Sequence, residues 1–102
     1  MHHPVKKIFA RFRHYSDDQL VTLARRLPPG GELHLDLRGV DHLSSAALAA
    51  LLALNLRLTS TDKRLVLHNL DPDLYHLLHL TRLTAVLETR CQAAPGGTAV
   101  VT

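Results

Sequence analysis

Residues 32–58 read ELHLDLRGVDHLSSAALAALLALNLRL, and this stretch decides which class of fold the chain can adopt. Its first part, residues 32–38, alternates strictly between leucine and polar side chains. A period of two is typical of a β-strand that buries one face. From Ser44 onward the sequence is rich in alanine and leucine, the strongest helix formers. We therefore expect a strand over 32–38 and a helix over 44–58.

Strand and helix patterns alternate on both sides of this stretch. Further segments with strand character are 5–13, 64–70 and 84–89. Further helices begin at Ser16, a capping residue followed by two acids, and at Asp71, which is followed by proline. The resulting β-α-β-α-β-α-β order predicts an α/β fold, with helices packed on a small mixed, mainly parallel sheet.

The size of the chain indicates one domain. It has 102 residues, of which 46% are hydrophobic and 21% are charged, as in an ordinary globular protein. We expect a single domain over residues 1–90. The segment after it, residues 91–102, is Gly-rich near its start, and we expect it to form a flexible C-terminal tail.

Composition argues against several classes of partner and environment. The net charge is only +3, the basic residues are scattered, and aromatic residues are 4% of the chain, which disfavours nucleic acid as a partner. Cys91 is the only cysteine, so an internal disulfide is excluded. The sequence has neither a signal-peptide pattern nor the apolar run of about 20 residues that spans a bilayer. We expect a cytoplasmic protein that does not insert into membranes.

Signals for catalysis, cofactors and metals are weak. The sequence has no glycine-rich phosphate loop and no glycine-framed nucleophilic serine. His42 precedes Ser45 by three positions, but only Asp41 is placed to orient it. The eight histidines lack the several thiolates that commonly complete structural zinc sites, so we interpret them, including His34 and His68, as ordinary polar surface positions. We predict a binding protein, not an enzyme, with no cofactor and no metal.

The helix over 44–58 is unusual because it is apolar on every side between Ser45 and Asn55. Such a helix is either buried all round or presents an apolar face to a partner, and the sequence leaves both alternatives open. Its many alanines leave a shallow surface on which another helix can dock closely: Ala46, Ala47, Ala49, Ala50 and Ala53.

Residues 31–89 resemble the STAS domain family, whose fold occurs in anti-sigma factor antagonists and in the tails of sulphate transporters. Four tripeptides carry the resemblance: Leu35-Asp36-Leu37, Gly39-Val40-Asp41, His68-Asn69-Leu70 and Thr81-Arg82-Leu83. The last of these has arginine where the family has glycine.

The resemblance implies a protein-interaction module for signal transduction, which binds an anti-sigma factor or kinase-like regulatory protein through the 39–45 loop and helix 44–58. The serine that is phosphorylated in the family corresponds to Ser45, at a helix N-terminus that favours a phosphate. The partner-binding residues implied are Asp41, His42, Ser44, Ser45, Ala46, Leu48 and Ala49. The motif is degenerate, because Ser44 replaces an aspartate and Ala46 and Ala47 replace a hydroxyl residue and a glycine.

Several alternatives remain open from the sequence. The chain can be a soluble STAS subunit or scaffold of a transport or signalling assembly. It can also be a small anion- or nucleotide-binding domain that uses the loop after strand 32–38. A homo-oligomer formed through an exposed N-terminal edge strand is a further alternative. The sequence does not name the partner, nor does it decide between a switch and a constitutive scaffold.

Overall fold

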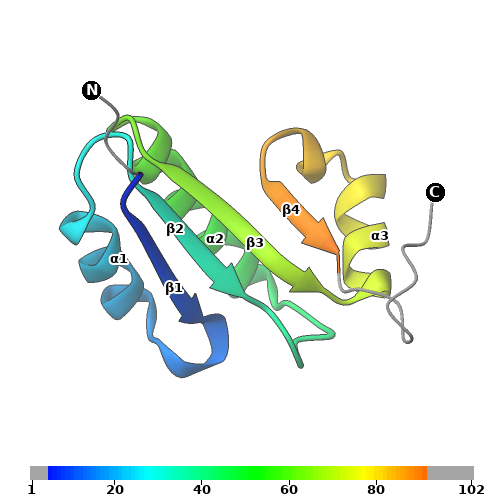
Figure 1. The fold of residues 1–102 in the computed structure, drawn as a ribbon. Coiled ribbons are helices and arrows are strands. Elements are labelled where there is room, and N and C mark those ends of the chain that lie inside the picture. Colours follow the sequence, from blue (N-terminus) through cyan, green and yellow to red (C-terminus); the bar gives the residue numbers. More distant parts are fainter. Residues whose placement is uncertain (1–4, 92–102) are drawn as a thin grey trace.

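A computed structural model describes residues 5–91 of the chain (Figure 1). Its elements follow one another as β1 (Lys7–Arg11), the 3-10 helix η1 (Phe12–His14), α1 (Asp17–Arg26), β2 (Glu32–Asp36), α2 (Ser45–Thr59), β3 (Arg64–Leu70), α3 (Pro72–Leu80), the 3-10 helix η2 (Leu83–Ala85) and β4 (Glu88–Cys91). The predicted α/β class is confirmed, and the order of helices and strands is the predicted one.

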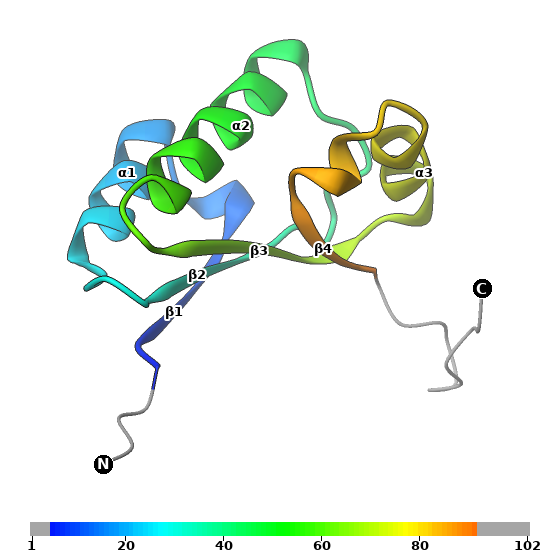
Figure 2. The same ribbon diagram turned by 90° about the horizontal axis from the view of Figure 1, so that it is seen from above.

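The four strands form one sheet in the order β1-β2-β3-β4, which is their order along the chain. Every pairing between them is parallel, so the sheet is not mixed. Parallel crossovers share one hand, and each connection here steps to the next strand in the same direction. All three α-helices therefore lie on one face of the sheet, while within residues 5–91 no helix lies over the opposite face (Figure 2).

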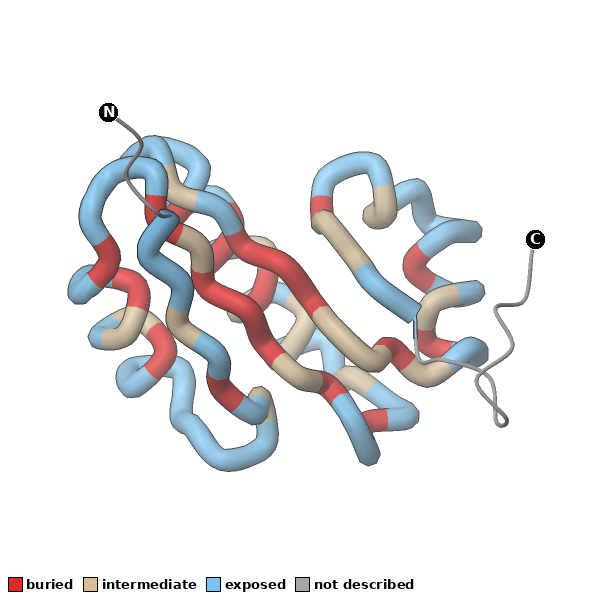
Figure 3. Tube along the Cα trace, in the orientation of Figure 1, coloured by how far each residue is buried: buried red, intermediate tan, exposed pale blue. Residues whose placement is uncertain are grey.

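The hydrophobic core lies between the sheet and this single layer of helices. The leucines that alternate along β2 and β3 point into it, and Leu33, Leu35 and Leu67 have no exposed surface. The central strands are accordingly the most continuously buried part of the chain (Figure 3). Helix residues that close the core from the other side are Leu20, Ala24, Leu51, Leu54, Leu58, Leu74 and Leu78.

The helix starts are fixed by local hydrogen bonds that the sequence predicts. At α1 the Ser16 hydroxyl accepts from the Gln19 backbone N–H at 3.2 Å, and the Gln19 side chain accepts from the Ser16 N–H at 2.8 Å. This reciprocal pair is a capping box, which satisfies two of the amides that a helix start leaves free. At α3 the Asp71 carboxylate accepts from the Asp73 N–H at 3.0 Å, with Pro72 as the first helical residue.

The predicted last strand over 84–89 is wrong in its position. The backbone of Arg82 is left-handed, with a φ of 63°, and the chain then turns through η2 before β4 begins at Glu88. Carbonyl groups of this turn are held by local bonds, including that from the Leu87 N–H to the Leu83 oxygen at 2.8 Å. Cys91, expected in the tail, is the last residue of β4, and residues 92–102 lie outside the described part of the chain.

Strand 5–13 is also shorter than predicted, because the chain leaves the sheet after Arg11 and forms η1. Within residues 5–91, none of the helices combines the length and the apolar character that crossing a membrane requires.

Leu67 provides a test of the core assignment, because it is fully buried at the centre of β3. We expect Leu67→Ala to lower the free energy of unfolding by about 2–5 kcal/mol, since it removes buried contacts and leaves a cavity. Urea denaturation at neutral pH measures the change. Leu80→Ala on α3, where the leucine is 66% exposed, is the control and should change the free energy by less than about 0.5 kcal/mol. Equal losses for the two variants would contradict this core.

Candidate functional site

The loop between β2 and α2 is held by its own backbone and by a neighbouring arginine. The Val40 N–H donates to the Leu37 carbonyl at 2.9 Å, which closes a turn, and both of these side chains are buried. Gly39 inside the turn has a φ of 81°, which strongly favours glycine. Its carbonyl accepts from the Arg13 guanidinium at 3.4 Å, and a Cβ on Gly39 would lie only 2.9 Å from the same group.

The residues that follow this turn reach solvent at the start of α2. Asp41 and His42 are exposed. Leu43 is half-buried, and its packing against the core anchors the loop. Ser44 caps the helix, with its hydroxyl accepting from the Ala47 N–H at 3.0 Å. Serine therefore does the capping that the family's aspartate would do. Ser45, the first helical residue, is exposed at the positive end of the helix dipole.

The structure answers how the apolar helix is covered. One side of α2 is buried in the core through Leu51, Leu54, Asn55 and Leu58. Its outer side is uncovered, and this side carries a stripe at helical spacing that is apolar and exposed: Ala46, Ala49, Ala53 and Leu56. We term these four residues the outer stripe of α2. The leucine at its end is 69% exposed, which is unusual for a large apolar side chain.

The predicted contact residues divide between this surface and the core. The structure brings together Asp41, His42, Ser44, Ser45, Ala46 and Ala49, all of them exposed, around the first turns of α2. Leu48 is instead half-buried and packs against the core, as do other side chains on its side of the helix. Ala50, its near neighbour, is half-buried at the side that faces α1.

A groove of about 590 Å³ runs between α1 and α2, beside the outer stripe. Its lining is mostly apolar, from Leu20 and Val21 on α1 and Ala53, Leu54 and Leu56 on α2. Two charges of opposite sign, Asp17 and Arg57, also line it. On the other flank of α2 the Asn55 amide donates to the Val86 carbonyl at 3.4 Å, which places an exposed valine next to the helix.

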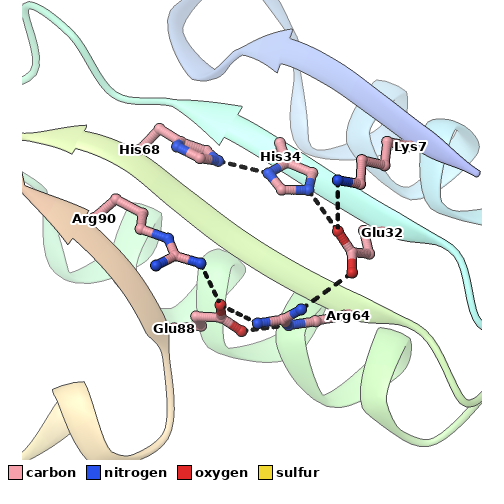
Figure 4. A network of polar contacts seen from close by, with 7 residues as sticks. All are labelled: Lys7, Glu32, His34, Arg64, His68, Glu88 and Arg90. Atoms are coloured by element: carbon pink, nitrogen blue, oxygen red, sulfur yellow. Dashed lines mark hydrogen bonds and ion pairs between the residues drawn. The ribbon is translucent and has the colours of Figure 1, made fainter. Parts of the chain in front are cut away.

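The helix-free face of the sheet carries a polar network that the sequence analysis missed (Figure 4). His34 is only 8% exposed; its Nε2 lies 2.8 Å from Glu32 Oε1 and its Nδ1 lies 2.5 Å from His68 Nε2. Arg64 bridges the carboxylates of Glu32 and Glu88. The interpretation of His34 and His68 as ordinary surface positions is therefore wrong. The sequence signal that could have predicted this network is that both histidines lie on the polar faces of the two central strands.

This geometry limits the histidine pair to one proton between the facing nitrogens. The Nε2–H of His34 donates to the Glu32 carboxylate, so its Nδ1 either accepts from His68 Nε2 or, when protonated, donates to it. If both facing nitrogens carried protons, the 2.5 Å contact would break. Burial lowers the pKa of His68, and the neighbouring His34 and Arg90 lower it further. The hydrogen bond from His34 lowers the pKa of Glu32.

Comparison with known proteins assigns a family to this arrangement. The family model described as "Mlab, STAS domain" matches residues 6–88, which include β1, β2 and β3, all three α-helices and the first residue of β4. No curated protein matches the sequence significantly.

The lowered pKa of His68 predicts how stability depends on pH. The unfolded chain takes up a proton at the ordinary value of 6.5, whereas the folded protein resists protonation until lower pH. The free energy of unfolding should therefore fall as the pH drops through 6.5, and should level off below the folded pKa. His68→Gln removes the group that causes this loss and keeps an N–H for His34. The free energy of unfolding of the variant should therefore rise relative to that of the wild type as the pH is lowered.

Urea denaturation between about pH 5 and 8 measures this difference, and it stays above the range where Glu32 titrates. His76→Gln on α3 is the control for removing a histidine outside the network. If the difference in the free energy of unfolding between His68→Gln and wild type does not change with pH, the prediction is contradicted.

Proposed function

Since the chain belongs to the STAS domain family, we propose that it is a protein-interaction module that binds a regulatory partner of the anti-sigma factor or kinase type. The binding surface is the 39–45 loop together with the outer stripe of α2. The uncovered apolar stripe is the observation that carries the proposal. An exposed apolar row with a groove beside it, on a helix whose opposite side is buried in the core, is typical of an interaction site.

The shape of this surface favours a helix as the docking element. Alanine at three of the four stripe positions allows a partner backbone to approach closely, and Leu56 provides a ridge at one end. The groove between α1 and α2 can receive the apolar side chains of such a helix. Asp17 and Arg57 in its lining supply opposite charges that can orient the partner.

The proposed role is binding without catalysis. Among residues 5–91, no hydrogen bond joins His42 to Ser45, although both are exposed in the same loop and helix start. A nucleophilic serine is activated through such a contact with a base. The polar residues of the loop are better suited to form the rim of an interface, around the apolar stripe.

Within this function, Ser45 is the candidate switch. A phosphate on its exposed hydroxyl would add about −1.5 to −2 charges at the edge of the outer stripe. It would be well accommodated by the helix N-terminus, but it would oppose an acidic or apolar partner surface. The altered motif around it, with Ser44 and Ala46, favours a second candidate: constitutive binding as a subunit or scaffold of a transport or signalling assembly.

Ala49→Arg tests the docking surface, because Ala49 is exposed in the middle of the outer stripe. We expect the variant to fold as the wild type does and to capture at least about tenfold less partner, since the docked helix would bury an unpaired charge. Leu80→Arg, at an exposed leucine of α3, is the matched control. The measurement is quantitative mass spectrometry of proteins captured by each form from its native cells, with circular dichroism to check folding.

One stoichiometric protein captured by the wild type and by Leu80→Arg, but not by Ala49→Arg, supports the proposal. Equal capture by all three forms would place the interface elsewhere. Thermal stabilisation of the isolated protein by a nucleotide, without any such partner, would favour the ligand-binding alternative.

Mass spectrometry of the protein isolated under phosphatase inhibition tests the switch. We expect a phosphate on Ser45 and none on Ser44, whose hydroxyl already accepts from the Ala47 N–H. Ser45→Asp should then weaken partner capture, whereas Ser45→Ala should preserve it. An unmodified Ser45 with a stable partner would instead establish constitutive binding.

A further inference from the structure

The helix-free face of the sheet is an exception to a general rule. Sheets made only of parallel strands almost always have both faces covered, because their crossover helices lie on both sides. Here every helix lies on one side, and the other face is bare over the described residues (Figure 2). Val66 at the centre of this face has no exposed surface, and His34 beside it is 8% exposed.

This face carries a protruding ring next to a hollow. Phe9 on β1 is 70% exposed, although its ring stacks on His34 with 4.7 Å between the centroids. The adjoining hollow has a volume of about 360 Å³, enough for an aromatic side chain. The side chains that line it include Phe9, Arg11, His34, Asp36, His68 and Asn69.

The charges of this face favour a partner with a similarly balanced surface. The face has four cations, Lys7, Arg11, Arg64 and Arg90, against three carboxylates, Glu32, Asp36 and Glu88. Most of them are already paired with one another, as in the bridges of Arg64 to Glu32 and Glu88. Such a surface has little net field to attract a nucleic acid or a highly charged peptide, and two copies of it repel only weakly.

We propose that the helix-free face binds a second copy of this chain about a two-fold axis, with Phe9 of each copy entering the hollow of the other. A two-fold interface needs a surface that is complementary to itself, and a knob beside a matching hollow provides this. The inserted ring would lie among the rings of the partner's His34 and the partner's His68. At the rim, Arg11 would pair with Asp36 of the partner subunit.

Pairing through the face is favoured over pairing through the edge of the sheet. The exposed edge strand β1 is flanked by cations, Lys6, Lys7 and Arg13, which oppose alignment with the same strand of another copy. Four strands about 4.8 Å apart, each about five residues long, make a face of roughly 300 Å². This is below the roughly 800 Å² per partner of a standard stable interface, so we expect a reversible dimer in the micromolar range.

Sedimentation velocity of the full chain over about 5–500 μM tests the proposal, because a weak dimer follows mass action. Phe9→Glu should shift the dissociation constant at least about tenfold towards the monomer. Leu80→Glu is the matched control: this leucine is 66% exposed, much like the phenylalanine, but it lies on α3, outside both the helix-free face and the outer stripe of α2. A monomeric wild type over the whole range would overturn the proposal, as would a dimer that Leu80→Glu dissociates and Phe9→Glu does not.

Isotope-filtered NMR on a mixture of labelled and unlabelled chains locates the interface directly. Intermolecular contacts from the Phe9 ring to His68 and Asn69 are expected. In an unfiltered spectrum of the uniformly labelled chain, contacts from that ring to residues 92–102 of the same chain would show that this segment covers the face, and would overturn the proposal. The outer stripe of α2 takes no part in either experiment, so the proposed function stands or fails separately.

Discussion

Leucine contacts between the two central strands and α2 are the interaction on which the rest of this structure depends. Leu33, Leu35 and Leu67 are fully buried on one face of the sheet, and α2 lies over this face and packs against β3. Because strands are paired in chain order and each crossover has the same hand, there is one helical layer and one core. Both candidate interaction sites lie on surfaces that are not buried in this single core.

The surface on the helical side of the molecule and the surface on the sheet side differ in the kinds of residue that they expose. On the helical side, α2 buries one face and leaves an apolar outer stripe with a groove beside it. On the sheet side, the exposed row is polar: Lys7, Arg64 and Arg90 form ion pairs with Glu32 and Glu88, and His34 is hydrogen-bonded to Glu32. The first surface offers buried apolar area to a partner, and the second offers a single aromatic ring within a paired ionic network.

The start of α2 links the fold to the proposed function. Ser44 uses its hydroxyl to cap the helix, and the turn at Gly39 holds the loop that leads to it. Ser45 is left exposed at the end of the outer stripe, so a change of charge there would reach the docking surface without disturbing the core. This separation between the capping residue and the exposed residue allows a switch, and it equally allows constitutive binding.

The sequence by itself determined the order of elements and the strand 64–70, because alternation and helix capping are local signals. It also located β2 and α2, with the strand predicted two residues too long at its end, over 32–38, and the helix placed one residue early, over 44–58. It did not place the last strand, because the left-handed backbone of Arg82 and the hydrogen-bonded turn after it leave no alternation or capping signal in the sequence. Only the tertiary structure decided that all helices share one face and that His34 and His68 meet at 2.5 Å. Both depend on which strands lie side by side, a relation between residues 34 positions apart that no local pattern encodes.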